Sequence, residues 1–136
     1  MIVVDTNVVA YLWIDGPMTN SAIALARADD AWVAPPLWRS ELRNLLATLV
    51  RTRRLTESQA LRSAANAEAQ MTGAERPVET EDVLSLAARS GCSAYDCEFV
   101  ALAMSLGVPL VTCDRKLAKA FPKVARLLEE AVEADS

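Results

Sequence analysis

The sequence predicts an α/β fold, in which helices cover both faces of a mainly parallel sheet. Short apolar runs alternate along the chain with longer helical segments, and this alternation is typical of such folds. Of the 136 residues, 52% are hydrophobic but only 5% are aromatic, so we expect a core of alanine, leucine and valine. No linker, repeat or low-complexity segment interrupts the pattern, and residues 1–136 are therefore expected to form a single domain.

The first half of the chain is expected to contain two strands and four helices. Ile2–Val4 and Trp32–Ala34 are short apolar runs that are typical of buried strands. Capping residues and helical periodicity predict helices over Val8–Trp13, from Thr19 or Asn20 to about Asp29, over Leu37–Arg51, and from a capping box at Thr56 to about Met71. The apolar stripe of the third helix is expected to consist of Trp38, Leu42, Leu45 and Leu49.

The second half is expected to begin with a short strand at Pro77–Glu79 and to end ambiguously. The predicted elements between are a helix capped by Thr80 and ended by Gly91, a helix from Ser93 or Ala94 to Gly107, a strand over Pro109–Thr112, and a short helix from Asp114 to Phe121. Residues 123–136 fit either a short strand with a tail or a helix. We expect the C-terminal segment, about 124–136, to be partly flexible.

Composition excludes several classes of function. The formal net charge is −4, which excludes a nucleic-acid binder held by overall positive charge. Histidine is absent, so Ser-His and Cys-His nucleophiles and histidine-ligated zinc are excluded. The odd count of 3 cysteines argues against a disulfide framework, and the chain has neither a signal-peptide pattern nor a membrane-spanning run. We therefore expect a cytoplasmic protein with no membrane partner.

Two acidic residues follow predicted strands. Asp5 comes directly after Ile2–Val4, and Asp114 follows the strand that ends at Thr112. The carboxyl ends of parallel strands meet at one edge of the sheet, where ligands bind in open α/β folds. Both residues are also suited to cap the helix that follows them, so position alone leaves both roles open.

Glu41 and Asp96 are two further acids in unusual positions. Asp96 lies in the first turn of an otherwise almost entirely apolar helix, where a purely structural role would be interaction with the helix dipole, worth ~0.3–1 kcal/mol. Glu41 lies on the flank of an apolar helical stripe. Neither Arg39 nor Arg43 stands three or four positions away, so a local ion pair does not explain Glu41.

If these four acids converge, electrostatics require a cation. Two carboxylates about 4 Å apart repel by about 4 kcal/mol at an effective dielectric constant of about 20. Four can stay together only by taking up protons or by binding metal. Oxygen ligands suit Mg²⁺ or Mn²⁺, which retain waters and bridge to phosphate groups. The pattern therefore predicts a site suited to metal-assisted hydrolysis of a phosphodiester.

Three segments of the chain resemble motifs of PIN-domain ribonucleases. Ile2–Val8 resembles the opening of the family, Ser93–Ala103 its third acidic motif, and Leu110–Leu117 its fourth. Glu41, in a helix entered through a proline-rich turn, fits the second acidic position. The resemblance covers essentially the whole chain, and within the family it is greatest to the VapC-type toxins of bacterial and archaeal toxin–antitoxin pairs.

The resemblance implies a PIN-like three-layer α/β/α sandwich with a short, mainly parallel five-stranded sheet. It implies Mg²⁺- or Mn²⁺-dependent endoribonuclease activity on RNA, a homodimer, and a small VapB-like antitoxin that inserts a segment into the active-site groove to form a hetero-oligomer. It assigns metal binding and catalysis to Asp5, Glu41, Asp96 and Asp114. It places Thr6 and Thr112 where hydroxyls orient these acids or a metal-bound water.

Several basic residues are candidates for contacts with RNA or with the antitoxin. Arg39 and Arg43 flank Glu41, and Arg115 follows Asp114. The cluster over 51–54 fits either phosphate binding or the complementing of a helix C-terminus. Some family members carry a further acid after the fourth motif, and that position is vacant here. Glu98 is expected to point away from the four acids, because it lies two positions after Asp96 on a helix.

Two other functions fit parts of the sequence. An aspartate after a first strand also suits the covalent nucleophile of a phosphohydrolase, although Asn7 stands where haloacid-dehalogenase-like enzymes carry a second aspartate. A non-catalytic binding module would keep the fold without the chemistry. The presence of acids at all four positions argues against that second alternative.

Overall fold

The computed structural model describes residues 1–134 and has a parallel sheet at its centre. The strands are β1 (Ile2–Val4), β2 (Trp32–Val33), β3 (Leu110–Thr112) and β4 (Ala125–Leu127). Their order is β2-β1-β3-β4, and every neighbouring pair is parallel. Because all strands run the same way, their carboxyl ends share one edge of the sheet.

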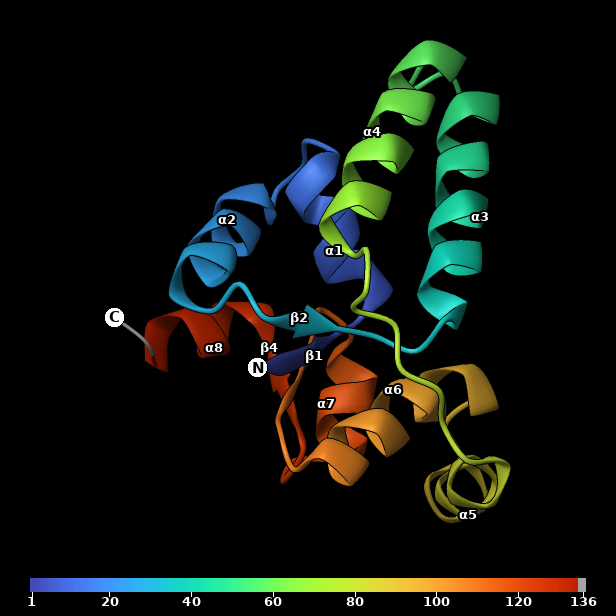
Figure 1. Cartoon of the computed structure of the whole chain (residues 1–136), viewed down its shortest axis with the longest axis vertical. Helices are drawn as coiled ribbons and strands as arrows, with labels where there is room; N and C mark the ends of the chain where they lie inside the picture. The colour runs from blue at the N-terminus through green and yellow to red at the C-terminus, as the bar shows by residue number, and fades with distance from the viewer. Residues whose placement is uncertain (135–136) are drawn as a thin grey trace.

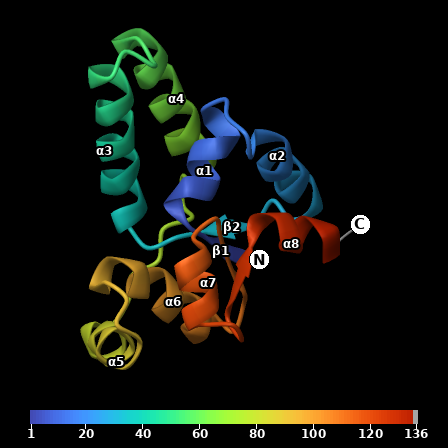
Figure 2. The ribbon, with the colours of Figure 1, turned by 180° about the vertical axis from the view of Figure 1, so that it is seen from behind.

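Helices pack on both sides of this sheet, as the sequence predicts. The described helices are α1 (Thr6–Trp13), α2 (Thr19–Ala28), α3 (Leu37–Arg51), α4 (Glu57–Gln70), α5 (Thr80–Ser90), α6 (Ala94–Leu106), α7 (Arg115–Ala120) and α8 (Leu128–Ala134). Figure 1 shows α1 to α4 on one side of the strands and α5 to α7 on the other. The reverse view in Figure 2 shows the same three layers, with α3 and α4 projecting as a long pair. The predicted α/β/α sandwich is confirmed.

The sheet has four strands in the described chain, so the prediction of a fifth strand is wrong. Pro77–Glu79 forms no strand. Beyond β2 the sheet is extended by a single parallel bridge between Ala34 and Glu75. The Arg76 amide donates to the Ala34 carbonyl at 3.0 Å. Pro77 then has no N–H to continue the pairing, so the edge ends there.

The ambiguous C-terminal region contains both of the alternatives considered for it. Its first part is β4, which pairs with β3 in the register Leu110 to Ala125. Its second part is α8, which lies beside α2 (Figure 1). Residues 135–136 of the predicted C-terminal segment lie outside the described residues.

Some helix boundaries and caps differ from expectation by a residue or two. The capping box of Thr56 and Gln59 opens α4 as predicted. In contrast, α1 begins at Thr6 rather than Val8, because the Asp5 carboxylate caps the helix by accepting a hydrogen bond from the Thr6 amide. Thr80 is the first residue of α5, and the N-cap is Glu79, which makes no side-chain capping hydrogen bond.

The core is built largely from alanine, leucine and valine, with two tryptophans. Trp32 and Trp38 are buried, and Trp38 is completely so. In α3 the buried stripe is Trp38, Leu42 and Leu46, whereas Leu45 and Leu49 are only partly buried. The predicted stripe is therefore wrong at Leu45 and Leu49, which face a groove beside α1. No helix within residues 1–134 is long and apolar enough to cross a membrane.

Candidate active site

The site is built on Asp5, which follows β1 at the carboxyl edge of the sheet. Its side chain is only 8% exposed. One carboxylate oxygen, Oδ1, accepts from the Thr6 amide at 2.8 Å, and the other, Oδ2, accepts from Thr112 Oγ1 at 2.6 Å. Asp5 therefore caps α1 and is also tied to the neighbouring strand β3.

Thr112, the last residue of β3, connects two of the predicted acids. Its hydroxyl donates to Asp5 and accepts from the Asp114 amide at 3.0 Å. Asp114 caps α7, since its Oδ1 accepts from the Leu117 amide at 3.2 Å. Both structural capping roles considered from the sequence are therefore present. They leave Asp5 and Asp114 on adjacent strand ends.

Thr6 brings the helix α3 into the site. Its Oγ1 donates to Glu41 Oε1 at 2.7 Å, across 35 positions of sequence. Glu41 comes from a helix that begins after the proline turn 35–36, well away from β1 in the chain. This hydrogen bond fixes one oxygen of a carboxylate that is about half-buried.

Asp96 completes the group from the first turn of α6. That helix is capped by Ser93, whose hydroxyl accepts from the Asp96 amide at 3.0 Å. Burial raises the pKa of Asp96 above its usual value, and the charge of Asp114 raises it further. Lys116 opposes this effect, so its ammonium lies within electrostatic range of Asp96.

Hydrogen bonds of Thr6 and Thr112 link Asp5, Glu41 and Asp114, and Asp96 lies within electrostatic range of them. Burial is the main cause that raises the pKa of Asp5 to about 6, and the charges of Glu41 and Asp96 contribute. Burial likewise raises the pKa of Glu41, with a contribution from Asp96. Asp114 is linked to the group through Asp96. The structure thus brings together the four acids that the sequence singled out, although sequence spacing gave no proof of it.

Buried polar side chains mark the same place independently. Among the side chains that the structure describes, Asp5, Thr6 and Thr112 are the buried polar or charged ones, and all three belong to this cluster. Polar residues are rarely buried without hydrogen-bond partners, and each of these has one. The hydroxyls of Thr6 and Thr112 hold carboxylates in place, which is the geometry expected of them.

The ligand chemistry of the group fits a hard divalent cation. All the available ligand atoms are oxygens, which suit Mg²⁺ or Mn²⁺ and not a soft metal. No three acidic or cysteine side chains in residues 1–134 are arranged to enclose an ion by themselves. Mg²⁺ is commonly held by one or two carboxylates and several waters, so two of these acids meet that requirement.

The three predicted arginine contacts are engaged elsewhere. Arg39 pairs with Glu68 at 3.1 Å and with Glu75 at 3.2 Å, in the region where α4 packs beside α3. Arg43 lies 3.7 Å from Glu68, and Arg115 pairs with Glu129 at 3.2 Å. Partly exposed pairs of this kind contribute little free energy and can open to receive a phosphate or a partner carboxylate.

One residue near the acids, Tyr95, is not among the candidates that the sequence pointed to. It is 63% exposed and directly precedes Asp96. A large aromatic residue in a first helical turn, between the capping serine and an acid, is the signal that could have identified it. Glu98 lines a separate pocket beside α5, in agreement with the expectation that it points away from the four acids, although its charge still raises the pKa of Glu41.

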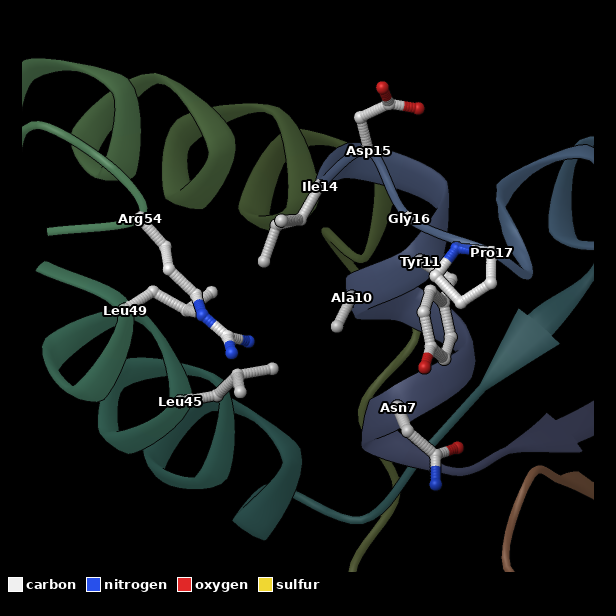
Figure 3. A pocket seen from close by; sticks show the side chains of 10 residues that line it. All are labelled: Asn7, Ala10, Tyr11, Ile14, Asp15, Gly16, Pro17, Leu45, Leu49 and Arg54. Carbon is white, nitrogen blue, oxygen red and sulfur yellow. The ribbon is translucent and has the colours of Figure 1, made fainter. Parts of the chain in front are cut away.

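A pocket of about 320 Å³ lies between α1 and α3, and none of the four acids is among its lining residues. Figure 3 shows Asn7 at one end, Arg54 at the other, and an apolar floor between them. The floor includes Ala10 and the partly buried leucines Leu45 and Leu49. No described residue forms an ion pair or side-chain hydrogen bond with Arg54, so its guanidinium is available to a ligand.

Comparison with known proteins agrees with this fold. PAE2754 from Pyrobaculum aerophilum superposes with a TM-score of 0.76 at 22% identity, covering 98% of this chain and 95% of that chain. FitAcB from Neisseria gonorrhoeae gives a TM-score of 0.66 at 20% identity, covering 92% of this chain and 96% of that chain. No curated protein sequence matches significantly. The profile of the PIN domain matches residues 2–126, and the chain therefore belongs to the PIN domain family.

Proposed function

We propose that this chain is a metal-dependent endoribonuclease and that it acts as the toxin of a toxin–antitoxin pair. The observation that carries the proposal is the convergence of Asp5, Glu41, Asp96 and Asp114 at the carboxyl edge of the sheet. Membership of the PIN domain family supports nuclease chemistry, and the resemblance to VapC-type toxins supports RNA as the substrate.

In this proposal the four acids bind the metal ion, and the two threonines orient the acids. Asp5 and Asp96 would hold one Mg²⁺ or Mn²⁺, and Glu41 and Asp114 would complete or extend the site. When bound, the ion supplies the positive charge that activates a water and neutralises the phosphate oxygens. Thr112 keeps Asp5 oriented, and Thr6 does the same for Glu41, so the carboxylates need no rearrangement before substrate arrives.

The burial of Asp5 disfavours the alternative of a covalent aspartyl nucleophile. Its side chain is only 8% exposed. A nucleophile must be reached by the phosphorus atom of the substrate, whereas a metal ligand need only be reached by a small ion. The alternative of a non-catalytic binding module is disfavoured by the retention of four clustered acids, which costs stability unless a cation is bound.

The partners in this proposal are RNA, a second copy of the chain and a small VapB-like antitoxin. The pocket between α1 and α3 supports the antitoxin, because an apolar side chain would fit its floor and a carboxylate could reach Arg54. We treat residues 1–136 as one catalytic domain that works in the cytoplasm. The pairs formed by Arg39 and Arg115 would have to open for those residues to contact RNA or antitoxin.

The test is cleavage of a mixed pool of structured RNAs by the purified chain without antitoxin. The reactions contain Mg²⁺, Mn²⁺ or a chelator, and they are repeated with Asp96→Asn. We expect defined cuts in the presence of metal, no cuts with chelator, and at least a hundredfold loss in the variant, of the size seen when electrostatic stabilisation of the transition state is removed.

Two results would contradict the proposal. Cleavage by Asp96→Asn at the wild-type rate would separate any activity from these acids. A trapped aspartyl-phosphate on Asp5 would identify a phosphohydrolase instead. Glu57→Gln is the matched control, since Glu57 is an exposed acid in the first turn of α4 and should leave cleavage unchanged.

A further inference from the structure

A second pocket, of about 430 Å³, opens directly beside the candidate acids. One wall comes from α3, and the other is Tyr95 at the start of α6. The residues that line it are Leu37, Ser40, Glu41, Asn44, Leu45, Thr48 and Tyr95. Glu41 belongs both to this pocket and to the acid cluster, so a group in the pocket lies next to the reacting centre.

The α3 wall presents polar groups at regular helical spacing. Ser40, Asn44 and Thr48 are exposed and stand four residues apart, so they form one row along the helix surface. Neither the Ser40 hydroxyl nor the Asn44 amide forms a side-chain hydrogen bond with any described residue. Asparagine offers both a donor and an acceptor, which matches the edge of a nucleobase.

The opposite wall is an aromatic face that no packing requirement explains. Tyr95 is 63% exposed, whereas the phenylalanine and valine that follow on the same helix, Phe99 and Val100, are buried. Aromatic side chains placed beside a nucleic-acid path bind bases by stacking, which tolerates any base because every base has a π-face. Leu37 and Leu45 supply apolar surface for the same planar group.

The charge of the residues that line this pocket determines which part of a nucleotide can bind in it. Its lining contains the Glu41 carboxylate and no lysine or arginine. A phosphate would be repelled there, whereas an uncharged base would not. We infer that the Tyr95 pocket binds one unpaired nucleobase next to the scissile phosphate, stacked on the Tyr95 ring and hydrogen-bonded by Asn44. This inference rests on the proposed ribonuclease function and makes Tyr95 a substrate-positioning residue.

The experiment pairs a protein change with a substrate change. The substrates are short single-stranded RNA oligonucleotides that span the mapped cut, either intact or with an abasic ribose at one position near it. The proteins are wild type, Tyr95→Ala, Tyr95→Phe and the control Leu61→Ala, which removes a side chain that is 64% exposed on α4. We measure kcat and KM for every combination with Mn²⁺ present.

We expect the two changes to report the same lost contact. One abasic position should raise KM about tenfold for wild type, and Tyr95→Ala should raise it by the same factor on intact RNA. Tyr95→Ala on the abasic substrate should lose nothing further, since the stacked pair is already absent. Tyr95→Phe, which keeps the ring, and Leu61→Ala should resemble wild type, and kcat should change little throughout.

Three results would overturn the inference, and they are distinguishable. If the increases in KM caused by Tyr95→Ala and by each abasic position multiply, no base stacks on Tyr95. The proposed nuclease function would still stand. If Tyr95→Ala leaves KM unchanged but alters the sedimentation behaviour of the protein, Tyr95 belongs to a protein interface instead. If wild type makes no cut that depends on Asp96, the proposed function fails and the nucleobase pocket fails with it.

Discussion

Two threonine hydroxyls organise the acids at the scale of single residues. Thr112 is completely buried and holds Asp5, while Thr6 holds Glu41. The sequence motifs predicted that these hydroxyls orient acids. They could not show which hydroxyl serves which acid, because Thr112 and Asp5 are 107 positions apart and meet only when β3 pairs with β1.

The first prediction concerns the ionisation of Asp5 in the metal-free protein. Its pKa is raised from 3.8 to about 6 on folding, mainly by burial. Between about pH 4 and pH 6 the folded state therefore binds more protons than the unfolded state, so stability must fall as the pH rises through this window. A shift of this size corresponds to about 3 kcal/mol at neutral pH.

Urea unfolding with chelator at a series of pH values measures this effect. We expect the free energy of unfolding of wild type to fall, relative to Asp5→Asn, as the pH rises from about 4 to about 6, and then to stay level. Asparagine can still accept from the Thr6 amide but not from the Thr112 hydroxyl as well, so the charge is identified by how the difference varies with pH and not by its size. A difference between the two proteins that does not vary with pH would show that the Asp5 carboxyl carries no such penalty.

At the scale of elements, strand ends were predictable and helix neighbours were not. Asp5 and Asp114 lie where the sequence placed them, since each directly follows a strand of a parallel sheet. Arg39 was expected near the acids. It pairs instead with Glu68 and Glu75, because α4 and the segment after it pack beside α3. A helical sequence shows which residues share a face but not which helix lies opposite.

The second prediction, which concerns a helix cap, separates the capping role of Asp114 from its charge. Asp114→Asn keeps a side-chain oxygen for the Leu117 amide, so α7 should lose only a few tenths of a kcal/mol. Asp114→Ala removes the cap and should cost about 1 kcal/mol. If the charge serves the site, both variants should lose at least about tenfold in metal-dependent cleavage. Thermal unfolding and cleavage of the mapped RNA give the two readouts.

Thr56→Ala provides the comparison for a cap without a catalytic role. It removes the capping box of α4 and should also cost about 1 kcal/mol, yet leave cleavage unchanged. Wild-type cleavage by Asp114→Asn would show that Asp114 is only a cap.

At the scale of the whole molecule, the sequence was enough to predict the layers of the fold but not all of the contacts between them. Alternating strands and helices predicted the sandwich, and the order of elements was largely right. The predicted fifth strand does not form, because backbone pairing beyond β2 ends with the Arg76 amide, before Pro77. The convergence of Glu41 with Asp96 depends on how α3 and α6 are placed around the sheet, and no local pattern encodes that placement. The family resemblance supplied it instead.

If the four acids form one cation site, metal ions must stabilise the folded protein through them. Thermal unfolding is measured for wild type, the double variant Asp5→Asn/Asp96→Asn and the control Glu57→Gln/Glu81→Gln over a Mn²⁺ titration. We expect Mn²⁺ to raise the Tm of wild type and of the control, because the ion binds the folded state, and we expect no response from the double variant. An unchanged wild-type Tm, or an equal rise in the double variant, would contradict it.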